Sequence, residues 1–297
     1  MSPTAIALIL VAAIAHATWN LFGKQASATG AAFFIWLMAA WAALFYLPVA
    51  VISVALTHPH LTGLNWLFLG GTGLLHSGYF LCLQLGYRRG ELSVTYPIGR
   101  GSGALLAAVA GITLLGERPT AVSAAGTLAI IAGTIVLGMA PGQQQDEPGR
   151  AGSARSRRHH PIGFALTTGG FIACYTIWDK FAVSTLHTPP VLQGYAGFLV
   201  MTAVFAPFVL SDRHRLAGVW RDFRPQVLGG AVLSPLAYML VLFALRFTAV
   251  SAVAPAREIS VLFGVLLGRR LLGEGNLARR LAAAAAIVAG IIAIAVA

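Results

Sequence analysis

The sequence predicts an all-α, polytopic membrane protein with ten transmembrane helices, arranged as two inverted repeats of five helices each. Three observations predict this fold: the length of the apolar runs, the repetition of short motifs, and the one-sided distribution of lysine and arginine. Hydrophobic residues form 58% of the chain and charged residues only 10%, whereas about 25% of a soluble domain is charged. The composition therefore excludes an ordinary soluble protein.

Each apolar run has about 20 residues, the length that crosses a bilayer as a helix. A backbone exposed to lipid must satisfy its own hydrogen bonds, and alternating barrel strands are absent, so we expect every run to be helical. The first run lacks a basic segment before it and has a counterpart in the second half, which argues against a cleaved signal peptide. The predicted helices cover residues 3–23, 31–56, 65–87, 92–115, 120–140, 161–184, 190–210, 225–247, 250–271 and 278–297.

The second half of the chain repeats motifs of the first half. Tyr79 recurs as Tyr238, and the motif Ser-x-x-x-Pro that ends at Pro97 recurs with Pro255. Each copy lies about 158 residues after the original. Two homologous hydrophobic halves are typical of secondary transporters, which bind their substrate between the halves near the middle of the bilayer.

Lysine and arginine lie almost entirely on one side of the predicted bundle. Fifteen of the 20 fall in the loops after the odd-numbered helices, and only Arg118 and Arg246 fall in the opposite loops. The positive-inside rule places the Arg-rich loops in the cytoplasm and both termini outside. Because each half has an odd number of helices, the halves are inserted in opposite orientations. We predict a first repeat over 1–140, a cytoplasmic linker over 141–160 and a second repeat over 161–297.

Several of these features together resemble a known family. The ten helices, the five-plus-five repeat, the two prolines and the Leu-Gly-Glu segments at 115–117 and 272–274 resemble the EamA-type family of the drug/metabolite transporter superfamily. The resemblance covers nearly the whole chain. It implies a carrier of small metabolites, often an exporter of amino acids or related compounds, with a cavity lined chiefly by helices 1, 3, 4, 6, 8 and 9. Several relatives have cytoplasmic termini, so the external termini expected here are a departure.

Five charged side chains lie inside predicted helices, where charge is costly and is therefore a candidate for function. Arg100 and Glu258 each follow a repeated proline by three residues, so they occupy equivalent positions near mid-membrane. They either pair directly and join the halves, or bind the carboxylate and the ammonium of a zwitterion. Arg257 either meets an anionic substrate or pairs with its neighbour. Asp179 and Lys180 lie near the predicted external interface, where solvation is the alternative to a function.

A polar and aromatic face occurs in both halves. His16, Trp19 and Asn20 share one helical face, and the second half repeats the spacing with Tyr175, Trp178 and Asp179. Aromatic rings can stack on a flat or cationic ligand, histidine can carry a coupled proton, and a tryptophan at this depth can instead belong to the interfacial belt. The predicted substrate-binding residues are His16, Trp19, Asn20, His76, Tyr79, Tyr96, Arg100, Tyr175, Trp178, Asp179, Tyr238, Arg257 and Glu258.

The remaining motifs suggest structural roles. Pro97 and Pro255 remove backbone donors inside their helices, so they are either hinges for transport or kinks for packing. Glu117 and Glu274 are expected to cap or orient the helix that follows each of them. Small residues in the fifth and tenth helices predict close packing, and these two helices are either scaffold or the surface of a homodimer.

These observations predict a secondary transporter of the inner (plasma) membrane that exports a small polar organic metabolite by alternating access, with protons as the possible coupling ion. The alternatives are a flippase for lipid-linked headgroups, an exporter of cationic drugs and, from a different class, an intramembrane enzyme. The sequence has no Walker loop, no motif for covalent catalysis and no zinc-ligand spacing, so we expect no cofactor, metal or enzymatic activity. The formal net charge of +11 follows from the arginine-rich loops that set the topology. We therefore expect no nucleic-acid partner.

Overall fold

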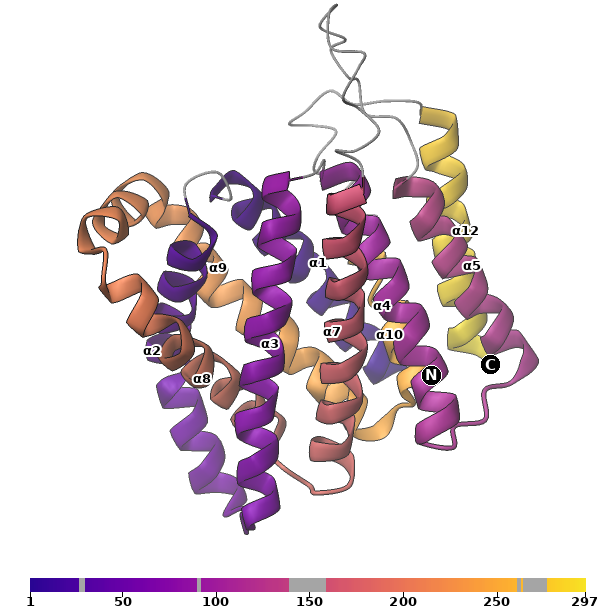
Figure 1. Cartoon of the computed structure of the whole chain (residues 1–297). Coiled ribbons are helices and arrows are strands. Elements are labelled where there is room, and N and C mark those ends of the chain that lie inside the picture. Colours follow the sequence, from indigo (N-terminus) through magenta and orange to yellow (C-terminus); the bar gives the residue numbers. More distant parts are fainter. Residues whose placement is uncertain (27–29, 90–91, 139–158, 261–262, 264–276) are drawn as a thin grey trace, which may run out of the picture.

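The computed structural model describes residues 1–26, 30–89, 92–138, 159–260, 263 and 277–297, and these ranges form ten helices (Figure 1). Their positions confirm the predicted all-helical, two-repeat fold. The helices are α1 (Pro3–Ala26), α2 (Ala31–Thr57), α3 (Gly63–Arg89), α4 (Leu92–Leu114), α5 (Ala121–Gly138), α7 (His159–Ser184), α8 (Pro190–Leu210), α9 (Arg213–Phe247), α10 (Val250–Ala256) and α12 (Leu277–Val296).

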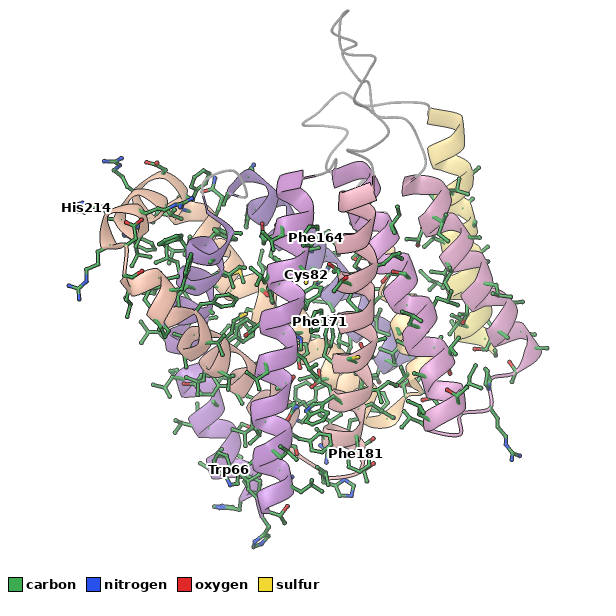
Figure 2. All side chains as sticks on the ribbon, viewed as in Figure 1. Trp66, Cys82, Phe164, Phe171, Phe181 and His214 are labelled. Atoms are coloured by element: carbon green, nitrogen blue, oxygen red, sulfur yellow. The ribbon has the colours of Figure 1, made fainter. Side chains whose placement is uncertain are left out.

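The outer faces of the helices are apolar, as a lipid environment requires. Five helices, namely α1, α2, α3, α8 and α9, contain segments long and apolar enough to cross a membrane, and α4, α5 and α12 contain shorter apolar segments. Exposed leucine, isoleucine and valine side chains lie along the outer faces of α2, α3, α4 and α5. Figure 2 shows the labelled Trp66, which is 62% exposed, toward one end of the bundle and His214 at the other. The chain is a multi-pass membrane protein.

Helix α9 begins twelve residues earlier than the sequence predicts. Asp212 caps its N-terminus by accepting a hydrogen bond from the backbone N–H of Arg215 at 3.0 Å, as short acidic residues commonly do. The helix then bends at Phe223, whose φ of −126° and ψ of 23° are not helical, just before Pro225. The expectation of a loop over residues 213–224 was therefore wrong, because a capped, charged helical segment occupies it.

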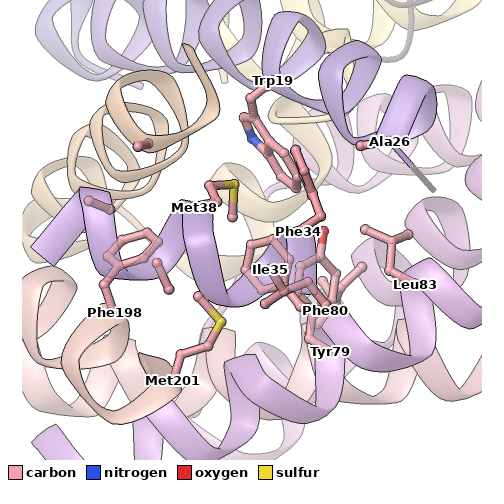
Figure 3. Packing of buried hydrophobic residues seen from close by; sticks show 14 of the residues in the cluster. Trp19, Ala26, Phe34, Ile35, Met38, Tyr79, Phe80, Leu83, Phe198 and Met201 are labelled. Carbon is pink, nitrogen blue, oxygen red and sulfur yellow. The ribbon is translucent and has the colours of Figure 1, made fainter. Parts of the chain in front are cut away.

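The helices of the two halves are interleaved, and they do not form two separate bundles. Helix α1 contacts α9, α2 contacts α8, and α3 and α4 both contact α7. The main apolar cluster lies between them, with α2 contributing Ile35 and Met38 and α8 contributing Phe198 and Met201 (Figure 3). The core of the molecule is thus the interface between the sequence halves.

Glycines allow α4 and α7 to approach closely. A methyl group on Gly103 would lie 2.7 Å from the Ile172 side chain, and one on Gly169 would lie 2.2 Å from Ser102 Oγ and 3.0 Å from the carbonyl oxygen of Gly99. Glycine at such a crossing removes the side chain that would hold the helices apart. Gly99 and Gly103 of α4 and Gly169 of α7 therefore serve packing between the halves.

Glycines also bring α5 and α12 close together. A methyl group on Gly126 would lie 2.6 Å from the carbonyl oxygen of Gly290, and one on Gly133 would lie 2.8 Å from the carbonyl oxygen of Ala283. The small residues of these two helices, from which the sequence predicts close packing, therefore pack α5 against α12.

Glu117 makes a contact that the sequence did not indicate. Gly116 has a φ of +68°, in the left-handed region that favours glycine, and it turns the chain after α4. The carboxylate of Glu117 then accepts hydrogen bonds from the backbone N–H groups of Val250 at 2.7 Å and Ser251 at 2.8 Å. Glu117 thus caps α10 of the other half, and not the helix that follows it as expected. Glu274 lies outside the described residues.

Neighbouring glycines of α7 provide a matched test of the α4–α7 crossing. We predict that Gly169→Ala lowers the thermal unfolding midpoint of the purified protein in detergent, because the added methyl must displace Ser102 and the α4 backbone, an overpacking cost of about 1–3 kcal/mol. Gly170→Ala is the control, since a methyl there has no atom within 4 Å. Equal midpoints for the two variants would show that the helices do not need this approach.

Candidate functional site

A partly open cavity lies between the two halves, and the space between its walls, solvent included, amounts to about 450 Å³. The first half contributes residues of α1 and α3, and the second half contributes residues of α7, α8, α9 and the turn after α10. Figure 3 shows part of this wall, where Trp19 and Tyr79 lie near the apolar cluster. The lining residues are His16, Trp19, His76, Tyr79, Phe80, Tyr175, Gly197, Phe198, Met201, Ser234, Tyr238 and Arg257.

Seven of the predicted site residues belong to this lining: His16, Trp19, His76, Tyr79, Tyr175, Tyr238 and Arg257. Asn20, Arg100, Trp178, Asp179 and Glu258 are buried or half-buried but do not belong to it. The side chains of Tyr96 and Pro97 are outside the described part of the structure.

The lining also corrects the expected set of helices. Gly197, Phe198 and Met201 bring in α8, the seventh predicted helix, whereas α4 contributes no residue to the described lining. Sequence reasoning missed these α8 residues together with Phe80 and Ser234. An apolar residue facing a cavity looks the same in a sequence as one facing lipid, so the sequence held no signal for them.

His16 presents a donor to the cavity. Trp19 Nε1–H donates to His16 Nδ1 at 3.2 Å, and the two rings meet edge to face. Because Nδ1 is the acceptor, the proton of the neutral imidazole is assigned to Nε2. Nε2 is buried and has no hydrogen-bond partner among the described residues. Asn20, the third member of the predicted face, donates instead to the His16 carbonyl at 2.7 Å.

The chain after α10 forms two tight turns that carry two adjacent charges. The helix ends at Ala256, just after Pro255. The N–H of Glu258 then donates to the Pro255 carbonyl at 2.9 Å, and the N–H of Ser260 to the Arg257 carbonyl at 3.1 Å, which are three-residue turns. Arg257 belongs to the cavity wall, whereas Glu258 contacts α4. Pro97, by contrast, lies within α4, which continues through it.

Arg100 and Glu258 form a buried ion pair between the halves. Arg100 Nη2 lies 2.9 Å from Glu258 Oε1, and the two side chains are 2% and 3% exposed. Ser260 Oγ lies 3.5 Å from the same nitrogen. The structure therefore joins the two residues that occupy equivalent positions of the repeat, and it places neither on the wall of the cavity.

Arg257 is the cation of the cavity. Its side chain is only 8% exposed, and its Nη2 lies 3.5 Å from the hydroxyl of Tyr175. Within the described residues, no carboxylate forms an ion pair with it. Its immediate neighbour Glu258 is already engaged with Arg100.

Asp179 lies directly behind the cavity wall. Its Oδ2 accepts the hydroxyl of Tyr238 at 2.5 Å, and its Oδ1 accepts Thr72 Oγ1 at 2.7 Å and Gln193 Nε2 at 3.0 Å. These donors come from α9, α3 and α8. Asp179 is 1% exposed, so the alternative of a solvated residue at the membrane surface was wrong. Thr72 and Gln193 are hydrogen-bond partners of Asp179 that the sequence analysis missed.

His76 connects this cluster to the aromatic wall. Its Nδ1 lies 2.8 Å from the carbonyl oxygen of Thr72, and its ring centroid lies 4.2 Å from that of Tyr175 and 4.6 Å from that of Tyr238. Tyr238 therefore donates its hydroxyl to Asp179 while its ring packs beside the His76 imidazole at the cavity.

The residues on either side of Asp179 stabilise the helix ends and interfaces around it. Trp178 Nε1–H donates to the Phe68 carbonyl at 2.9 Å, and its ring stacks on Phe68 with centroids 4.1 Å apart. Lys180 Nζ donates to the carbonyl oxygens of Leu245 at 2.8 Å and Thr248 at 3.0 Å. A cation at the C-terminus of α9 is favourable for the helix dipole.

Comparisons with known proteins agree with this architecture. A solved structure, described only as the crystal structure of a protein, has a TM-score of 0.72, shares 16% sequence identity and matches over 99% of both chains. At this identity the likeness shows the fold alone. No curated protein matches the sequence. The EamA-like transporter family matches residues 3–139 and 161–296, one match in each half. The chain therefore belongs to the EamA-like transporter family of the drug/metabolite superfamily.

Proposed function

We propose that this transporter moves a small polar organic metabolite, an amino acid or a related compound, across the inner (plasma) membrane by alternating access, and that it works as an exporter. The observation that carries the proposal is the cavity between the sequence halves, where rings, hydroxyls and a cation converge. A site shared by two mobile halves can open to either side in turn. The halves in this proposal are residues 1–140 and 161–297.

We propose protons as the coupling ion, with Asp179 as their carrier. An ionised Asp179 only accepts hydrogen bonds, so the Tyr238 hydroxyl must point its hydrogen at Oδ2. When Oδ2 takes up a proton, it becomes the donor and the Tyr238 hydroxyl becomes the acceptor. The Tyr238 hydrogen then turns toward Thr72 Oγ1, 3.0 Å away, or toward the cavity. Protonation is thus transmitted to the wall that meets the substrate.

The proposed orientation has the linker in the cytoplasm and both termini outside. In Figure 1 both termini lie toward the opposite end of the bundle from the end of α5 and the start of α7, which flank the linker. The exposed arginines at the start of α9 lie at the linker end. The alternative of a cationic-drug exporter requires an acid on the wall, and the described lining contains none.

Transport assays test the proposed coupling. In proteoliposomes supplied with a mixture of amino acids, we expect a pH gradient to drive accumulation of at least one of them. Mass spectrometry of the vesicle contents measures this accumulation. Asp179→Asn keeps the shape and one acceptor oxygen but cannot exchange a proton, so gradient-driven accumulation should be lost while exchange at equal pH continues. Asp222→Asn, an exposed position, is the control. Unchanged gradient dependence in Asp179→Asn would remove this residue from the coupling.

Labelling tests the orientation. In a background with Cys82 and Cys174 replaced by alanine, we expect Ser153→Cys to resist a membrane-impermeant maleimide in intact cells and to react in inverted vesicles. Ser2→Cys should show the reverse pattern. Labelling of Ser153→Cys in intact cells would invert the proposed topology without changing the fold.

A charge swap tests whether the ion pair joins the halves or grips the substrate. Arg100→Glu or Glu258→Arg alone leaves two like charges buried together, and breaking a buried pair costs about 3–5 kcal/mol. Because neither side chain lies on the cavity wall, the double variant should recover both the unfolding midpoint and the flux, with an unchanged KM. A double variant that folds normally but has lost flux would assign the pair to substrate binding.

A further inference from the structure

We infer that the substrate is a small organic carboxylate with a compact apolar or aromatic body, and that Arg257 binds its carboxylate. This inference rests on the proposed function, because it names the substrate class for the same cavity. It narrows the proposed amino acid or related compound to one recognised through its carboxylate, and it distinguishes such a substrate from neutral and cationic metabolites.

The chemistry of the wall is that of a receptor for an anion. The described lining contains one guanidinium, two imidazoles, three tyrosine hydroxyls and one serine hydroxyl, and no carboxylate. A cationic ligand would meet a like charge here and would find no acid to neutralise it. The wall therefore selects against cations as well as for anions.

Arg257 is a buried cation that has no ion-pair partner within salt-bridge distance in the described part of the protein. The two buried acids nearest in the chain or in the fold are engaged elsewhere: Glu258 pairs with Arg100 at 2.9 Å, and Asp179 accepts three hydrogen bonds from neutral donors. A buried charge without a partner is strongly destabilising. A bound carboxylate would supply that partner and could accept two parallel hydrogen bonds from the guanidinium.

His16 supplies a second donor from the other half of the molecule. Its Nε2–H is buried and lacks a partner among the described residues, and it belongs to the same cavity wall as Arg257. One donor is on α1 and the other follows α10, so an anion between them would contact both halves. Substrate binding would then bias the arrangement of the halves, which alternating access requires.

The rest of the wall defines the body of the substrate. Trp19, Phe80, Phe198 and Met201 offer apolar and aromatic surface. A single guanidinium matches one carboxylate, whereas a doubly charged phosphate would keep an unneutralised charge in a buried site. We therefore favour a monocarboxylate over a phosphate ester.

Binding to the purified full-length protein in detergent tests the inference by titration calorimetry. The probes are phenylpropionate, indole-3-acetate and isovalerate, each compared with its amide, with the corresponding amine and with phenyl phosphate. We expect at least one carboxylate to bind at least tenfold more tightly than its amide and amine. Tighter binding of the amines or of phenyl phosphate, or no saturable binding of any carboxylate, would overturn the inference.

Two variants then assign the binding to Arg257. Arg257→Gln should raise the Kd of the carboxylate at least tenfold and leave that of the amide unchanged, and Arg257→Lys, which keeps the charge, should recover part of the affinity. Arg246→Gln removes an exposed positive charge and is the control. An equal effect of Arg257→Gln on the carboxylate and the amide would remove this residue from the recognition of charge.

The binding result is separable from the proposed function. Carboxylate binding that depends on Arg257, without flux in proteoliposomes, would support the site and contradict transport. Flux of amines or neutral compounds, without carboxylate binding, would support transport and contradict the inferred substrate class. If Arg257→Gln fails to fold, the wild-type series of carboxylate, amide, amine and phosphate still decides between an anion and its alternatives.

Discussion

The cost of burying charge inside a membrane governs the centre of this protein. Arg100 and Glu258 are almost completely buried, and at 2.9 Å each compensates the charge of the other. Removing an ion from water costs several kcal/mol even after relaxation, so such a pair does not stabilise a fold by itself. What it does is specify an arrangement, because any sliding of α4 against the chain after α10 would leave two charges unpaired. The pair therefore fixes the register of one half on the other.

The other buried charges follow the same rule, with one exception. Asp179 receives three hydrogen bonds, Lys180 caps the end of α9, and Glu117 caps the start of α10 across the boundary between the halves. Each charge is placed where a backbone terminus or polar side chain already needs a partner. Arg257 differs, because its contact in the described structure is a hydroxyl at 3.5 Å. Among the buried charges of the described residues, a cation on a cavity wall without an ion pair is the natural candidate for a binding group.

The sequence predicted the fold well because hydropathy and repetition are strong signals in a membrane protein. Helix positions, and the encounter of Arg100 with Glu258, followed from apolar run length and from repeat equivalence. Neither signal could place residues 213–224 in a helix, since that segment is polar and its cap at Asp212 acts only locally. The contact of Glu117 with α10 was also beyond reach, because nothing in a sequence motif states which helix end a carboxylate will meet.

The site was predicted in part, and the division has a physical cause. Polar residues in apolar helices are conspicuous, so His16, His76, Tyr175, Tyr238 and Arg257 could be found by inspection. Phe198 and Met201 of α8 were invisible, since their type is that of any lipid-facing residue. Adjacent charges were harder still: Arg257 and Glu258 follow each other in the chain, and only the folded structure shows which one faces the cavity. Neighbouring residues of a helical segment point about 100° apart, so Glu258 meets Arg100 of the other half while Arg257 lies on the cavity wall.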